Sequence, residues 1–203
     1  MSSLQRHRIV AVVVGCVVFA LCAAVARTGT VPAWEAAVFR AVNGLPDWLT
    51  EPMQAAQFLG VLGVGLVVAA VAAAARKYWL AVAAVIVTVG KLLLERFVWK
   101  VLEIHRERPA ITEAVVTVRC KTAMTGLSFV SGHVILVTAL AWIVTPYLHG
   151  RWRVAPWAVV ALVSFARVYL GAHNPLDVVG GLALGTVLGA TTAFMLNLPR
   201  DEA

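Results

Sequence analysis

Residues 175–196 read PLDVVGGLALGTVLGATTAFML and carry a single charged side chain, Asp177. An α-helix needs about 20 predominantly apolar residues to cross the hydrocarbon core of a bilayer, so this segment predicts a transmembrane helix. Its glycines recur at four-residue spacing on one helix face; they are Gly181, Gly185 and Gly189. Such a face of small residues predicts close packing on a neighbouring helix of the chain, or on a second subunit in a homodimer.

The composition extends this prediction to the whole chain. Of its 203 residues, 61% are hydrophobic and 13% are charged, whereas soluble domains are about half apolar and a quarter charged. These values exclude an ordinary soluble globule and a disordered chain. Apolar segments separated by polar turns predict six membrane spans, at about residues 9–26, 53–75, 78–94, 131–148, 154–170 and 175–198. We therefore expect an all-α integral membrane bundle of six transmembrane helices that forms a single domain over residues 1–203.

The segment between the first two spans, residues 27–52, predicts a short amphipathic helix. Trp34, Val38 and Val42 recur at every fourth position, and Asn43-Gly44 is a typical helix stop. We expect this helix to lie in the membrane interface rather than to cross the bilayer.

The net charge of +7 arises largely from basic residues in loops and at the ends of spans. In a membrane protein this pattern favours cytoplasmic retention and contact with anionic lipid or phosphate, and not the binding of nucleic acid. With the N-terminus inside, the inner segments are mostly basic, with Arg6, Arg8, Arg76, Lys77, Arg151, Arg153 and Arg200. The outer loops also contain many basic residues, so the charge distribution leaves the opposite orientation open. We expect a multi-pass protein of the plasma (inner) membrane with both termini in the cytoplasm.

Polar residues cluster at three places that alternating span direction brings to one membrane face. The clusters are residues 100–109, 131–133 and 167–177. Lys100, Arg108 and Arg167 supply three cations, and a guanidinium fork matches the oxygens of a phosphate. Ser131 and Gly132 begin the fourth span, where the free backbone N–H groups of a helix N-terminus favour an anion. The pattern predicts a phosphate-binding site at this face.

Two histidines belong to the same clusters. Asp177 follows His173 by four residues, a spacing at which a carboxylate can hold one imidazole nitrogen and leave the other as a nucleophile or base. His133 lies just inside the fourth span, opposite His173. Two imidazoles beside a bound phosphate indicate covalent catalysis with a separate proton donor. Asn174-Pro175 predicts the N-cap and first residue of the last span.

Together these segments resemble the three signature motifs of the type 2 phosphatidic acid phosphatase (PAP2) family, KxxxxxxRP, PSGH and SRxxxxxHxxxD, over about residues 53–197. The third motif matches at Arg167, His173 and Asp177, with Ala166 in place of serine. The second matches at residues 131–133, with Val130 in place of proline. The first matches at Arg108-Pro109, but Lys100 lies one residue too far away, and Arg106 is an alternative source of the second charge.

The resemblance implies a membrane lipid phosphatase that needs no metal and no other cofactor. His173 would attack phosphorus and form a phosphohistidine, and Asp177 would orient His173. His133 would protonate the leaving oxygen and then activate water. The phosphate oxygens would be bound by Lys100, Arg108, Ser131, Gly132 and Arg167.

A site embedded in the bilayer implies a lipid phosphate substrate, here at the extracytoplasmic face. The Ala- and Val-rich composition suggests a bacterial source, which favours a polyprenyl phosphate or diphosphate and the recycling of a cell-wall precursor carrier. Phosphatidic acid and phosphatidylglycerol phosphate are the other candidates. Two alternatives stay open: a lipid-linked phosphotransferase on the same scaffold, and a protein that binds or transports a lipid phosphate without catalysis.

Overall fold

The computed structural model describes residues 3–113, 115–120 and 124–199, which fold into helices joined by turns and loops. The longer helices are α1 (Ser3–Ala26), α4 (Leu62–Ala74), α5 (Tyr78–Lys100), α7 (Gly132–Val144), α8 (Ala155–Tyr169) and α9 (Pro175–Met195). The shorter elements are α2 (Ala33–Asn43), α3 (Thr50–Gln57), α6 (Pro109–Thr112) and the 3-10 helices η1 (Asp47–Leu49), η2 (Phe58–Gly60), η3 (Thr145–Tyr147) and η4 (Gly150–Val154). The described residues form no β-strand, which confirms the all-α prediction.

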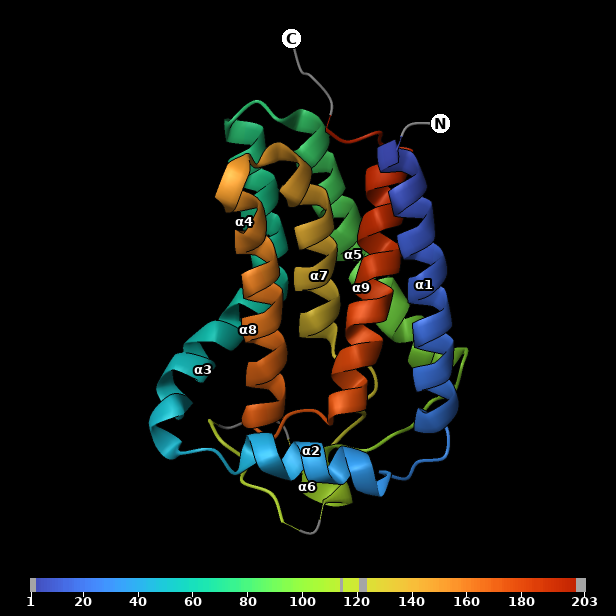
Figure 1. Cartoon of the computed structure of the whole chain (residues 1–203), viewed down its shortest axis with the longest axis vertical. Helices are drawn as coiled ribbons and strands as arrows, with labels where there is room; N and C mark the ends of the chain where they lie inside the picture. The colour runs from blue at the N-terminus through green and yellow to red at the C-terminus, as the bar shows by residue number, and fades with distance from the viewer. Residues whose placement is uncertain (1–2, 114, 121–123, 200–203) are drawn as a thin grey trace.

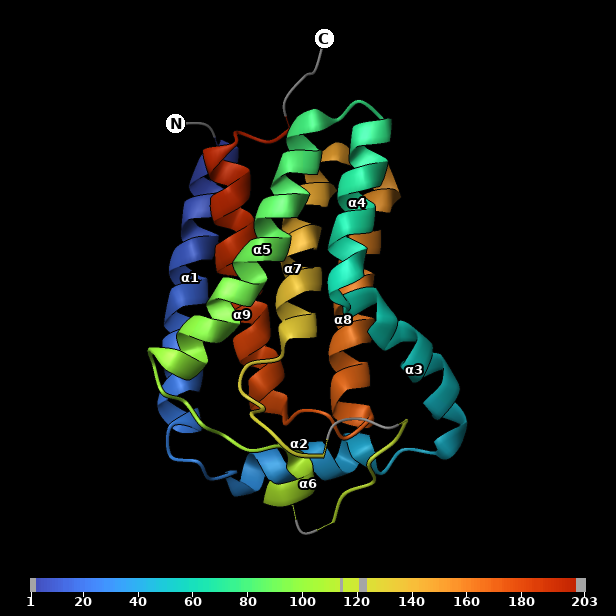
Figure 2. The same cartoon turned by 180° about the vertical axis from the view of Figure 1, so that it is seen from behind.

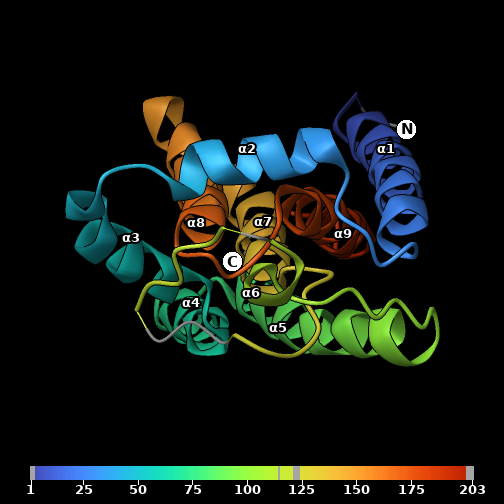
Figure 3. The same ribbon diagram turned by 90° about the horizontal axis from the view of Figure 1, so that it is seen from below.

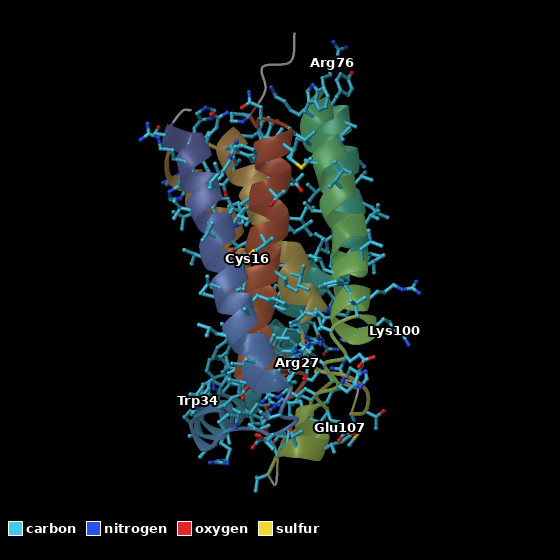
Figure 4. All side chains as sticks on the ribbon, turned by 90° about the vertical axis from the view of Figure 1, so that its right-hand side faces the viewer. Cys16, Arg27, Trp34, Arg76, Lys100 and Glu107 are labelled. Carbon is cyan, nitrogen blue, oxygen red and sulfur yellow. The ribbon has the colours of Figure 1, made fainter. Side chains whose placement is uncertain are left out.

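The longer helices run side by side along the long axis of the molecule, and α2 and α6 lie across one end of the bundle (Figures 1 and 2). Seen from that end, α2 crosses below α7, α8 and α9 (Figure 3). The start of α1, the end of α9 and the turn at Arg76 lie at the opposite end of the bundle (Figures 1 and 4). The end covered by α2 is the one at which the predicted site residues meet.

The described helices differ in their ability to cross a bilayer. By length and composition α1 and α9 qualify as membrane spans, and residues 47–60 and 62–74 together form a third candidate that is bent by 60°. α7 and α8 contain 13 and 15 residues and rise only about 20 and 22 Å, less than the roughly 30 Å of a hydrocarbon core. The structure thus supports two or three spans, and the number of six stays a prediction.

The glycine face of α9 packs on α7 of the same chain. A Cβ atom added to Gly185 would lie 2.6 Å from the carbonyl oxygen of Ile135, and one added to Gly189 would lie 2.8 Å from that of Ala139. Glycine is needed because α7 approaches α9 too closely for any side chain at these positions. The predicted tight helix contact is confirmed, but a homodimer through this face is not supported, because α7 already covers it.

The opposite side of α9 is covered by α1, the first helix of the chain (Figure 1). A Cβ atom added to Gly15 of α1 would lie 2.9 Å from Val187, so these helices are also in close contact. Arg8, one of the basic residues expected to set the orientation, is buried and donates hydrogen bonds to the carbonyl oxygens of Ala193, at 2.9 Å, and Leu198. It therefore ties the start of α1 to the end of α9. Arg200 lies outside the described residues.

The α2 helix confirms the expected helical element between the first two spans. Its inward face consists of Glu35, Phe39 and Asn43, which are all buried. Trp34 and Val38 are 57% and 47% exposed and point away from the bundle. Trp34 and Val38 thus lie on the outer face of α2, Val42 is partly buried against the core, and two polar side chains share the buried face.

Candidate active site

Five elements bring the predicted site residues to the end of the bundle covered by α2. Arg108 is the N-cap of α6 and Ser131 is the N-cap of α7. Arg167 lies in the last turn of α8, His173 in the turn that follows, and Asp177 in the first turn of α9. The Ser131 backbone N–H donates to the Asp177 carbonyl oxygen at 3.1 Å, so the N-termini of α7 and α9 are joined directly.

Three buried donors of the predicted phosphate-binding residues have no hydrogen-bond partner among the residues that the structure describes. They are Arg108 Nε, Ser131 Oγ and Arg167 Nε. Each guanidinium is held from one side: Arg108 Nη1 donates to the Ala172 carbonyl oxygen at 2.9 Å, and Arg167 Nη1 donates to Gln57 Oε1 at 2.5 Å. Buried donors are nearly always satisfied, and guanidinium groups match phosphate oxygens. The two cations and the hydroxyl therefore form a set of donors suited to a phosphate.

His173 lies beside these donors in a buried position, 4% exposed. Its ring nitrogen Nδ1 is 3.8 Å from Asp177 Oδ2 and 3.5 Å from Ser128 Oγ, which leaves Nε2 as the nitrogen for attack on a ligand. Burial lowers the pKa of His173 to about 4, while Asp177 opposes this shift. The imidazole is thus neutral near pH 7, as a nucleophile must be.

The Asp177 carboxylate has more partners than its predicted role requires. Oδ2 accepts hydrogen bonds from the Ser128 hydroxyl and, at 2.9 Å, from the Asn174 backbone N–H, and Oδ1 accepts one from Arg106 at 3.1 Å. The bond to Asn174 is the N-terminal cap of α9 and confirms the predicted start of that helix at Asn174-Pro175. Asp177 is therefore fixed before any ligand binds.

His133 occupies the first turn of α7, close to Arg167, Arg108 and His173, whose charges act on its ring. A Cβ atom added to Gly60 would lie 2.7 Å from the Cβ atom of His133, so η2 packs directly against this histidine. The structure thus brings together the two predicted histidines, with cationic side chains around them.

Gly132 has a different environment from the one predicted. A side chain there would collide with Glu95 Oε1 and would lie 2.7 Å from Lys91 Cε. Lys91 and Glu95, four residues apart on α5, form an ion pair at 2.7 Å, and this pair packs against the N-terminus of α7. Glycine at this position makes room for the ion pair, and it brings Lys91 beside the cluster.

Lys100 is not brought to the site. It is the last residue of α5, its side chain is exposed, and it lies on the outer side of the bundle (Figure 4). α5 ends at Lys100 and a loop leads from there to Arg108, so Lys100 stays at the end of α5 and does not follow Arg108 to the site. Arg106, the alternative cation, is fully buried, but it is engaged by two carboxylates.

Three residues that contact the site were not predicted for it: Gln57, Glu35 and Ser128. Glu35 had a detectable signal, because it falls four and eight residues before Phe39 and Asn43, on one face of α2. Ser128 lies just before the second motif. Gln57 had no signal, since it belongs to a segment expected to be a straight span.

Comparison with known proteins gives a family match that covers more than half of the chain. Residues 78–200 match the PAP2 superfamily. A lipid A 4'-phosphatase of Porphyromonas gingivalis is 34% identical over 64 residues, which are 30% of this chain and 26% of that protein. The alignment thus spans about a quarter of the length of this relative.

Two solved structures are similar in fold. The first transmembrane PAP2 type phosphatidylglycerolphosphate phosphatase from Bacillus subtilis superposes with a TM-score of 0.73 at 25% identity, and the match covers 94% of this chain and 98% of that one. Aquifex aeolicus LpxE superposes with a TM-score of 0.64 at 23% identity, covering 76% and 92%. Both similarities extend well beyond the residues of the three motifs.

Proposed function

The chain belongs to the PAP2 superfamily, and from this premise we propose that it is a membrane lipid phosphatase that works through a phosphohistidine intermediate. One observation carries the proposal: the buried, unpartnered donors of Arg108, Ser131 and Arg167 lie beside a neutral, buried histidine. A binding protein would need only the donors. A nucleophile with a fixed carboxylate behind it serves covalent chemistry.

In the first half-reaction the lone pair of His173 Nε2 attacks phosphorus. The new P–N bond forms as the P–O bond to the lipid breaks, and His133 gives its proton to the leaving oxygen. Arg108, Arg167 and the Ser131 hydroxyl bind the equatorial oxygens, where charge is spread in the transition state. Asp177 stabilises the positive charge that His173 acquires.

In the second half-reaction water attacks the phosphohistidine. His133, now neutral, takes a proton from the water as it approaches phosphorus. The P–N bond breaks, inorganic phosphate leaves, and both histidines return to their starting states. Neither half-reaction uses a metal ion. The described residues contain no group of three or more His, Cys, Asp or Glu side chains that could hold one.

A groove next to the site fits the hydrocarbon chain of a lipid. It has a volume of about 220 Å³ between α4, α7 and α8, and it begins at Leu59, next to the Gly60 that touches His133. From there it follows α7 from Val137 to Val144, a rise of about 10 Å. The lining is apolar, which favours a substrate with a long aliphatic tail.

We propose a polyprenyl phosphate or diphosphate as the preferred substrate, with phosphatidic acid and phosphatidylglycerol phosphate next. The solved relative from Bacillus subtilis acts on phosphatidylglycerolphosphate, and the Porphyromonas gingivalis relative on lipid A. A diphosphate would lose its terminal phosphoryl group and leave as a lipid monophosphate. Hydrolysis of a lipid monophosphate and of a lipid diphosphate would use the same nucleophile and the same phosphate-binding donors.

The proposed setting is the plasma membrane of a bacterium, crossed six times. Both termini and the turn at Arg76 would lie in the cytoplasm, and the end covered by α2 would face outward. Trp34 and Val38 on the outer face of α2 suit a helix that lies in the interface, because an exposed tryptophan favours the headgroup level.

The test is phosphate release by the purified protein in detergent with EDTA present, over a panel of polyprenyl and glycerol lipid phosphates. We expect release by the unchanged protein and its loss in His173→Ala. Release that persists in His173→Ala would overturn the assignment of the nucleophile. If phosphate is transferred to an added alcohol in preference to water, the phosphotransferase alternative replaces hydrolysis. If no phosphohistidine can be trapped and no lipid reacts, the binding or transport alternative holds.

A further inference from the structure

A chain of buried polar contacts links the interfacial helix α2 to the nucleophile. Glu35 Oε2 accepts a hydrogen bond from Arg106 Nη2 at 2.5 Å, and Glu35 Oε1 accepts one from Arg106 Nη1 at 3.0 Å. Arg106 Nη1 also donates to Asp177 Oδ1 at 3.1 Å. On its other oxygen Asp177 accepts from the Ser128 hydroxyl, which lies 3.5 Å from His173 Nδ1. These side chains come from α2, two loops and the start of α9.

Ser128 occupies the place where a direct contact between Asp177 and His173 was expected. The distance of 3.8 Å between Asp177 Oδ2 and His173 Nδ1 is too long for a hydrogen bond. The Ser128 hydroxyl is fully buried and donates to that same carboxylate oxygen. Its backbone N–H donates to the Arg106 carbonyl oxygen at 2.7 Å, so the two loops hold each other in place. Ser128 can thus set the distance between the carboxylate and the imidazole.

Arg106 is shared by two carboxylates and satisfies both. Burial would lower its pKa, but the hydrogen bonds with Glu35 and Asp177 outweigh burial and raise the pKa, so the guanidinium stays charged. The Asp177 carboxylate that Arg106 holds opposes the lowering of the His173 pKa that burial, Arg167 and Arg108 cause. The same carboxylate stabilises the positive ring of a phosphohistidine.

Glu35 has a second contact that reaches α9 itself. Its Oε1 accepts a hydrogen bond from the Leu176 backbone N–H at 2.8 Å, which is one of the free donors in the first turn of α9. Asp177 is the next residue. Glu35 therefore holds the backbone beside the catalytic aspartate as well as the arginine that contacts its side chain.

We propose that Ser128, Arg106 and Glu35 are positioning residues that fix Asp177 and, through it, His173; this inference rests on the proposed function. None of the three belongs to the set of donors assigned to the phosphate. Their loss should therefore slow the chemical step and leave substrate binding nearly unchanged.

The experiment measures kcat and KM of the full-length protein in detergent for Ser128→Ala and Glu35→Gln, on the best substrate found. We expect kcat to fall about 10- to 100-fold in each, the range that a lost donor or acceptor at a catalytic group commonly produces, with KM within threefold. The matched controls are Ser164→Ala, a partly buried serine of α8, and Glu107→Gln, an exposed acid of the same loop as Arg106. Both controls should keep kcat and KM.

The outcomes separate this inference from the proposed function. If His173→Ala is inactive while Ser128→Ala and Glu35→Gln keep kcat within twofold, or lose activity through KM alone, the positioning chain is wrong and the nucleophile stands. If His173→Ala stays active, the proposed function itself fails. Should Ser128→Ala not fold, Ser128→Cys takes its place: the thiol is a weaker donor, so an unchanged kcat would overturn the inference and a reduced kcat with KM preserved supports it.

Discussion

Replacing Gln57 by leucine tests whether the bent segment before α4 is part of the site. Gln57 accepts a hydrogen bond from Arg167 Nη1 at 2.5 Å, and Arg167 is 7% exposed, so the variant leaves a buried guanidinium donor without its partner. A hydrogen bond to a charged group contributes about 1.5–3 kcal/mol. Since about 1.4 kcal/mol corresponds to a tenfold change in rate, kcat/KM should fall roughly 10- to 150-fold if the bond is kept in the transition state.

The assay is phosphate release at low substrate concentration, with thermal unfolding measured on the same samples. Gln54→Leu is the matched control, because Gln54 lies about one turn earlier on α3 and is also partly buried. It should keep kcat/KM within twofold. An unchanged kcat/KM in Gln57→Leu, or an equal loss in Gln54→Leu, would refute the argument that Gln57 holds Arg167 in its phosphate-binding position.

Three further predictions follow from the structure. Because the pKa of His173 is lowered to about 4 while an unfolded histidine titrates near pH 6.5, the unfolded state takes up the proton first. The thermal midpoint should therefore fall as pH drops from about 6.5 toward 4, and His173→Gln should flatten that part of the profile; an identical slope in both proteins would contradict it. Gly185→Leu should lower the free energy of unfolding by about 1–3 kcal/mol, because the larger side chain overpacks the contact of α9 with α7. This corresponds to a fall of roughly 2–12 °C in the thermal midpoint. The control is Gly63→Ala in α4, where nothing lies within 4 Å of the new carbon, and it should leave the thermal midpoint unchanged. In a background without the native cysteines, a membrane-impermeant thiol reagent applied to intact cells should label Val115→Cys but not Arg151→Cys, and the reverse pattern would invert the proposed orientation.

The sequence predicted the helical class, the starts of α7 and α9 at the second and third motifs, and most of the residues that meet at the site, whereas α5 continues to Lys100, beyond its predicted end at residue 94. These features depend on local rules: apolar runs of sufficient length, an Asn-Pro helix start, and a four-residue separation between His173 and Asp177. The ion pair of Lys91 and Glu95, at 2.7 Å, is of the same local kind, because its partners lie four residues apart on α5. Residue spacing predicts a contact correctly when both partners lie on one helix or at its cap.

The contacts that the sequence did not predict have a common physical cause. They join segments far apart in the chain, and local spacing does not determine how such segments align. Lys100 lies on the outer side because α5 ends there and a loop, whose path the motif spacing does not predict, leads to Arg108. The glycine face of α9 could serve a second subunit or a neighbouring helix equally well, and the sequence does not distinguish them. Glu35 and Arg106 are 71 residues apart, so nothing in local spacing pairs them.

The break between η2 and α4 shows how such a distant contact can serve chemistry. Val61 has an extended backbone, with φ −73° and ψ 153°, and the helical segments on either side of it meet at 60°. Because of this break, η2 turns toward α7 and sets Gly60 against His133, while Gln57 reaches Arg167. Gln57 and Gly60 both precede Val61, so a continuous helix over residues 53–75 would carry the two positions together along the axis of α4. The apolar sequence allows either path, so the bend is best explained by the contacts that it makes, and these are contacts with a general acid and a phosphate ligand of the proposed mechanism.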